Sequence, residues 1–124
     1  MKICLGAYEV CFASGGVEVR RDRQLLYFNH RPVYVSVKTY GAINEFRDIP
    51  YDRLEEQVGT VTGEGLFVTK NGSEIAVRDI WSASGETLKI AREAEVRKSS
   101  CDDLGFQTRI FFYQAASDDL RAFE

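Results

Sequence analysis

The sequence predicts an all-β domain, an antiparallel β-sandwich, and three observations point to it. Apolar and polar residues alternate with a period of two in several runs, most clearly in VYVSVK at residues 33–38. Glycine-containing turn signals separate these runs. The strongest is Asn71-Gly72, because both residues accept the positive φ that a two-residue hairpin turn needs. The third observation concerns residues 87–98, which decide between a sandwich and a mixed fold.

Residues 87–98 are rich in good helix formers, yet their pattern favours a strand. In a helix, Leu88 would share a face with Arg92 and Glu95, so no clean apolar stripe forms. In a strand, one face is apolar except for a single arginine and consists of Leu88, Ile90, Arg92, Ala94 and Val96. A turn signal at residues 84–86 leads into the segment. We therefore expect a strand against the local helix propensity.

Four strands are expected in the first half of the chain, at residues 8–13, 17–21, 24–28 and 33–40. Ser14-Gly15-Gly16 closes the first two into a hairpin. Residues 41–57 break the alternation and contain Pro50. We interpret them as an ordered connection with a short helical turn at residues 51–57, since long loops in small domains are functional or packed across an opening.

The second half of the chain is predicted to form a meander, with strands at residues 58–62, 66–70, 73–82, 87–98 and 106–115. Gly63-Glu64-Gly65 lies between the first two of these and is interpreted as a turn. Ser117, followed by two aspartates, resembles a helix start with a serine cap, so a short C-terminal helix is expected there. Consecutive strands with one apolar face support one another, whereas a lone strand does not persist in water.

Composition indicates one globular domain over residues 1–124, with 44% hydrophobic and 28% charged residues. The net charge of −3 gives no general attraction to nucleic acid or to anionic lipid. No apolar run approaches the ~20 residues of a membrane-spanning helix. The first residues lack the apolar stretch of a signal peptide. These features predict that the chain binds neither nucleic acid nor a membrane. They also predict a cytoplasmic location, unless the sequence is a mature fragment whose targeting signal was left out.

The residues that carry chemistry are few. Three cysteines (Cys4, Cys11, Cys101) and one histidine (His30) do not suit a zinc site, which usually needs three or four Cys and His ligands, and the cysteines are expected to be small, buried and reduced. Adjacent acid pairs point apart rather than facing one another across ~5–9.5 Å. No phosphate loop or nucleophile elbow is present. We therefore predict no metal, no cofactor and no catalytic residue in this chain.

Arg92 interrupts the apolar face of its predicted strand, and two interpretations are open. Near a sheet edge, its stem would pack on the core while its head reaches water. Alternatively, it forms a buried ion pair with a carboxylate such as Asp79, which shares a face with Val77 and Trp81. In that case, loss of either partner would leave an uncompensated buried charge.

Three aromatic residues are candidates for carbohydrate contact. Tyr34 and Tyr40 lie on the polar face of their predicted strand, beside Ser36 and Lys38. A flat ring on a sheet face can stack against a sugar while neighbouring polar groups bind its hydroxyls. Packing against a second sheet or another domain is the alternative for both tyrosines. Trp81 is the third candidate, and the alternative for it is the core.

The last 45 residues resemble the end of the N-terminal β-sandwich domain, called a supersandwich, of large bacterial carbohydrate-active enzymes. Three motifs in the same order carry the resemblance: Asp79-x-Trp81, Leu88-x-Ile90-x-Arg92, and Gly105-Phe106-x-Thr108-Arg109-Ile110. In such enzymes the sandwich precedes an (α/α) barrel that usually holds the catalytic acid and base. At 124 residues, this chain is shorter than those domains.

The resemblance implies a non-catalytic accessory domain of a glycoside hydrolase-type enzyme, which acts as a scaffold and contacts carbohydrate. The implied partners are a carbohydrate or a catalytic (α/α) barrel domain. The alternative is a stand-alone β-sandwich module for protein–protein interaction, in which an uncovered sheet face serves as a subunit interface and allows a homo-oligomer.

Overall fold

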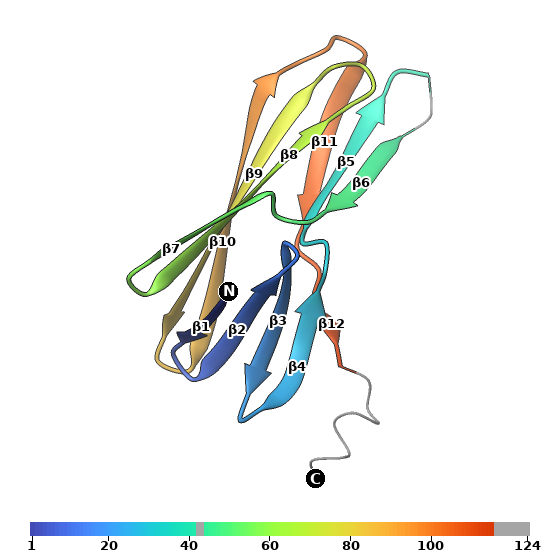
Figure 1. Cartoon of the computed structure of the whole chain (residues 1–124). Coiled ribbons are helices and arrows are strands. Elements are labelled where there is room, and N and C mark those ends of the chain that lie inside the picture. Colours follow the sequence, from blue (N-terminus) through green and yellow to red (C-terminus); the bar gives the residue numbers. More distant parts are fainter. Residues whose placement is uncertain (42–43, 116–124) are drawn as a thin grey trace.

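The computed structural model describes residues 1–41 and 44–115, and within them it is an all-β fold of three antiparallel sheets (Figure 1). In the order of their pairing, sheet A contains β1 (Lys2–Leu5), β2 (Tyr8–Ala13), β3 (Gly16–Arg21), β4 (Gln24–Asn29) and β12 (Tyr113–Gln114). Sheet B contains β11 (Asp103–Arg109), β5 (Val33–Thr39) and β6 (Glu45–Ile49). Sheet C contains β10 (Thr87–Lys98), β9 (Glu74–Ser84), β8 (Thr60–Val68) and β7 (Arg53–Gln57).

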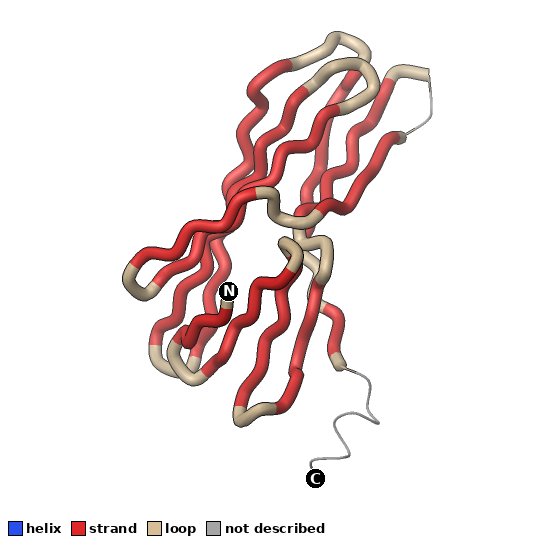
Figure 2. The backbone as a smooth tube through the Cα atoms, viewed as in Figure 1, coloured by secondary structure: helices blue, strands red, loops and turns tan. Residues whose placement is uncertain are grey.

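The sheets form a sandwich whose second layer is divided. Sheet C runs along the molecule as one layer, while sheets A and B lie end to end opposite it (Figure 1). The chain crosses between sheets A and B twice, at residues 30–32 between β4 and β5 and at residues 110–112 between β11 and β12 (Figure 2). We call the level of these crossings the waist, and the end of the molecule where β5 ends and β6 begins the tip.

One continuous core fills the space between the layers. The inward positions of β5, Val33, Val35 and Val37, are buried, as the alternation of the sequence predicts. They meet a second set of buried side chains on sheet C, which includes Val77 and Trp81. Full burial of one such aliphatic side chain stabilises the fold by about 1.5–3 kcal/mol. The alternating pattern is therefore the main energetic reason for the two layers.

Residues 87–98 form strand β10, which confirms the prediction made against their helix propensity. Along β10, Leu88, Ile90 and Arg92 are at least half-buried. Beyond Arg92 the strand is exposed on both sides, and Val96 is 47% exposed. The reason is that β10 is the edge strand of sheet C, so no further strand covers these residues, although their partners Val77 and Ile75 on β9 are buried.

The predicted turn at Gly63-Glu64-Gly65 is wrong, because these residues lie inside the continuous strand β8. The two glycines serve close packing instead. A Cβ atom on Gly63 would lie 2.8 Å from the ring of Tyr51, and one on Gly65 would lie 2.9 Å from Val33. Both distances are far shorter than ordinary contact, so only glycine lets β8 approach its neighbours here.

Residues 41–57 also differ from the prediction. They contain two strands, because β6 pairs with β5 and β7 pairs with β8, and the expected helical turn at residues 51–57 is absent. The pairing of β7 with β8 outweighs any local helical preference. The predicted strand 106–115 is divided into β11 and β12, because the chain leaves sheet B to join sheet A. The expected helix at Ser117 lies outside the described residues.

Two smaller points complete the fold. Strand β1 was not predicted, and it pairs with β2 at the edge of sheet A. The three cysteines are free thiols, but Cys4 and Cys101 are exposed rather than buried, and Cys11 is half-buried. Within the described residues, no helix is long and apolar enough to cross a membrane.

Candidate functional site

At the waist, the backbone leaves regular pairing, and side chains take over its hydrogen bonds. The buried Asn29 donates from Nδ2 to the carbonyl oxygen of Phe111 at 2.7 Å and accepts from the amide of Arg31 at 2.8 Å. It therefore ties the two crossings together. A buried carbonyl without a partner would cost free energy comparable to a lost hydrogen bond.

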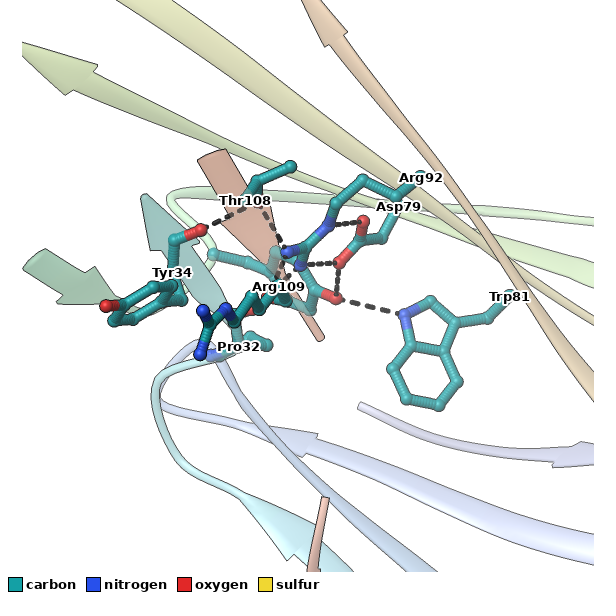
Figure 3. Close-up of polar contacts among 8 residues, drawn as sticks. Pro32, Tyr34, Asp79, Trp81, Arg92, Thr108 and Arg109 are labelled. Atoms are coloured by element: carbon teal, nitrogen blue, oxygen red, sulfur yellow. Dashed lines mark hydrogen bonds and ion pairs between the residues drawn. The ribbon is translucent and has the colours of Figure 1, made fainter. Parts of the chain in front are cut away.

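Arg92 reaches the same crossings from β10 (Figure 3). Its guanidinium donates to the carbonyl oxygen of Pro32 at 2.7 Å, to that of Arg109 at 2.6 Å and to Thr108 Oγ1 at 3.0 Å. Two further bonds go to Asp79, from Nε to Oδ1 and from Nη2 to Oδ2, both at 2.6 Å. A guanidinium has five N–H donors, so all of them have acceptors here.

The Asp79–Arg92 pair is buried, since the side chains are 1% and 7% exposed. The two residues lie directly opposite each other on β9 and β10, which brings the carboxylate and the guanidinium into a bidentate arrangement. Of the two interpretations that the sequence left open for Arg92, the structure has the buried ion pair. Such a pair offsets its desolvation cost only when the remaining hydrogen-bonding groups are also satisfied, as they are for Arg92.

Tyr51 and Trp81 join Asp79 and Arg92 in a hydrogen-bond network that we call the waist network. Tyr51 donates from its hydroxyl to Asp79 Oδ2 at 2.5 Å, and its oxygen accepts from Trp81 Nε1 at 3.1 Å. Burial, reinforced by the Asp79 carboxylate, raises the pKa of Tyr51 well above its ordinary value of 10.0. The hydroxyl therefore stays protonated and acts as a donor. Because its groups bond one another in the core, the network is structural.

At the tip, Asp103 organises a second polar cluster. Its carboxylate accepts hydrogen bonds from Thr69 Oγ1 at 2.7 Å, Ser73 Oγ at 2.5 Å and Asn71 Nδ2 at 2.9 Å. Desolvation by burial raises the pKa of Asp103, but the three hydrogen bonds outweigh it and hold the pKa below its ordinary value of 3.8. The cluster joins the β8–β9 hairpin to the start of β11.

A groove of about 690 Å³, the tip groove, lies beside this cluster. It is lined by Thr39, Tyr40, Asn44, Glu45, Phe46, Arg47, Lys70, Asn71 and Asp102. Tyr40 is 78% exposed and Phe46 is 65% exposed. The groove thus combines open aromatic surfaces with charged and amide side chains, and no sequence pattern pointed to it except Tyr40.

The outer face of the divided layer carries two clusters of aromatic rings, one on each sheet, which together we call the aromatic row. On sheet B, Tyr34 contacts Phe46 and Phe111, with ring centroids 6.3 and 5.2 Å apart. On sheet A, Phe28 contacts Tyr113 and His30, at 5.7 and 5.3 Å. These rings point away from the core because they alternate with buried residues such as Val33 and Val35.

The three carbohydrate-contact candidates therefore lie in three different environments. Tyr34 belongs to the aromatic row and Tyr40 to the tip groove. Trp81 is 1% exposed and packs edge-to-face on Phe12 and Phe112. Its ring offers no surface to a sugar, which removes it from the candidates.

No cluster of three or more His, Cys, Asp or Glu side chains suited to a metal ion occurs within residues 1–41 and 44–115. Sequence reasoning missed Tyr51 and Asp103. Their partners lie about thirty residues away along the chain, so no local pattern marks them. The Thr69 and Ser73 hydroxyls beside the Asn-Gly turn were a weak signal for a bound carboxylate.

In comparisons with known proteins, no protein-family model, no curated protein and no solved structure matches this chain.

Proposed function

We propose that this chain is a non-catalytic accessory domain of a carbohydrate-processing enzyme, which docks on a catalytic (α/α) barrel through the aromatic row. The row is the observation that carries the proposal. It runs over both sheets of the divided layer, and two of its rings, Phe46 and Tyr113, are more than half exposed. Clusters of exposed rings of this kind mark interaction sites more often than isolated surface hydrophobic residues do.

The opposite face of the molecule supports this choice of surface. The outward positions of β10 include Lys89, Glu93, Glu95 and Arg97, which suits contact with water. Charges along an edge strand also discourage pairing with other strands. A partner is therefore expected on the aromatic row and not on sheet C.

The enzyme class comes from the resemblance of the three ordered motifs to bacterial supersandwich domains. Two of these motifs contain the partners of the waist network, Asp79, Trp81 and Arg92. The third contains Thr108 and Arg109, whose oxygens accept from Arg92. One residue or more from each motif thus belongs to a single hydrogen-bond network, which is why their order along the chain is a better argument than any one motif.

The natural reading frame that contains this sequence provides the first test. A frame that also encodes helical hairpin repeats with facing acidic residues supports the proposal, and the two parts should then co-purify when expressed as separate chains. The double substitution Phe111→Ser/Tyr113→Ser should abolish co-purification, whereas Lys89→Ser on the opposite face should not. Hydrolysis of nitrophenyl glycosides by this chain alone would contradict the non-catalytic role.

The second candidate is a stand-alone module for protein–protein interaction, in which the aromatic row binds a second copy of the chain. The same exposed rings favour it, because they do not specify the partner. A stop codon directly after Glu124 together with a dimer in sedimentation experiments, lost in Phe111→Ser/Tyr113→Ser, would favour this candidate over the accessory domain.

A further inference from the structure

We propose that the tip groove binds a short neutral oligosaccharide. This inference rests on the proposed function and assigns the sugar contact to a surface distinct from most of the aromatic row. The groove volume of about 690 Å³ falls within the ~300–1,000 Å³ that is usual for small-ligand sites.

The aromatic side chains give the first argument. Tyr40 and Phe46 line the groove and are 78% and 65% exposed, so both expose apolar ring surface to water. The apolar C–H face of a pyranose ring can cover such a surface and release the water from it. Hydroxyls at the edge of the sugar would then face the polar side chains that line the same groove.

The charges of the groove favour a neutral ligand. Glu45 and Asp102 supply two carboxylates, and Arg47 and Lys70 supply two cations, so their formal charges cancel. An anion such as a phosphate or a sulfated glycan would meet both signs of charge, and nothing in the lining selects it. A polyhydroxyl ligand, by contrast, both donates and accepts hydrogen bonds and suits mixed donors and acceptors.

The groove is also held in place by the Asp103 cluster. That cluster fixes Asn71 directly and fixes the loop that contains Asp102 through Ser73 Oγ, which accepts from the amide of Ser100 at 2.9 Å. The amide of Tyr40 donates to the carbonyl oxygen of Asp102 at 2.8 Å. The backbone of three separate segments and the side chain of Asn71 are thus positioned before any ligand arrives, which lowers the entropic cost of binding.

Glu45 supplies the last argument. Its Oε2 accepts from the amide of Lys70 at 3.0 Å. Its Oε1, although buried, has no hydrogen-bond partner among the described residues. Buried polar atoms in native proteins nearly always have a partner, so a rotation of the carboxylate that brought Oε1 to a ligand hydroxyl in the groove would gain a hydrogen bond.

The test is a titration of the ¹⁵N-labelled chain with cellohexaose, xylohexaose and maltohexaose, with oligogalacturonate as the anionic comparison. We expect saturable amide shifts at Tyr40, Asn71 and Asp102 with at least one neutral probe. Tyr40→Ala should weaken binding about tenfold, and Tyr40→Phe should retain it, because stacking needs the ring and not the hydroxyl. Tyr113→Ala, a matched exposed aromatic in sheet A, should bind like the unsubstituted chain.

Three results would overturn the inference: no shifts at the tip with any neutral probe, saturation only by oligogalacturonate, or unchanged affinity in Tyr40→Ala. Each would leave docking through the aromatic row intact, since that docking is measured separately by co-purification. Conversely, loss of docking with intact sugar binding at the tip would contradict the proposed function alone.

Discussion

Asp79 at the waist and Asp103 at the tip perform similar tasks by different chemistry. Each carboxylate connects segments that are far apart in the sequence. Asp79 is 1% exposed and faces the guanidinium of Arg92, while Asp103 is half-buried and accepts from two hydroxyls and one amide. Neutral donors are sufficient near the surface because water still stabilises the charge, whereas a fully buried carboxylate needs an opposite charge.

Because of this difference, we expect Asp79 to contribute mainly to the stability of the fold and Asp103 mainly to the position of the tip loops. Loss of one partner at the waist would leave a buried charge between the two layers and threaten the whole sandwich. Loss of one hydrogen bond at the tip would loosen only the loops that line the groove.

The largest effect is expected from Arg92→Leu or Asp79→Asn. Each should lower the free energy of unfolding by about 3–5 kcal/mol, because the remaining group is left buried without its partner. The double variant Asp79→Asn/Arg92→Leu should lose less than the sum of the single effects, since it leaves no unpaired charge. Urea unfolding measures all of these values.

Arg78→Leu is the matched control, since Arg78 is an exposed arginine on β9 whose Nε lies 3.9 Å from Glu64 Oε1. This substitution should lower the free energy of unfolding by less than about 1 kcal/mol. Small and additive effects at Asp79 and Arg92 would show that their pairing does not stabilise the fold.

Tyr51→Phe should have an intermediate effect, about 1–3 kcal/mol, because Asp79 loses a donor and Trp81 Nε1 loses its acceptor. The pH dependence gives a second measurement. The folded-state pKa of Tyr51 lies above its ordinary value of 10.0, so the folded chain holds this proton more tightly than the unfolded chain does. Stability should therefore fall as the pH rises above 10.0, and Tyr51→Phe should remove that part of the decline. An identical alkaline decline in both proteins would contradict the assignment.

Asp103→Asn should have the smallest effect on global stability, about 1 kcal/mol or less, because the group is near the surface. The folded-state pKa of Asp103 lies below 3.8, so its contribution is complete above that value and is lost as the pH falls through the lower folded-state pKa. Amide exchange at Thr69 and Ser73 should accelerate in the variant at neutral pH, and exchange in the core strands should not change. Uniform acceleration across the molecule would show that the tip is not a separate unit.

A strand or contact could be predicted from the sequence where the residues that determine it lie close together along the chain. Strand β10 could be predicted because its alternation and the turn before it lie within one short segment. The partner of Arg92 could be proposed because Asp79 sits on an adjacent strand of the same meander. Strand β6, the division of the last strand and the role of Tyr51 could not be predicted, because each depends on pairing or contact across long stretches of chain.

Most of the strands and the buried valines of β5 follow from the sequence alone, since side chains alternate along any extended backbone and apolar ones must leave water. Tertiary contacts explain why the second layer is split, why Arg92 closes the waist, and why Tyr40 and Phe46 border one groove. Those features arise where segments distant in sequence meet, and the hydrogen bonds and close contacts that select them exist only once the sheets are assembled.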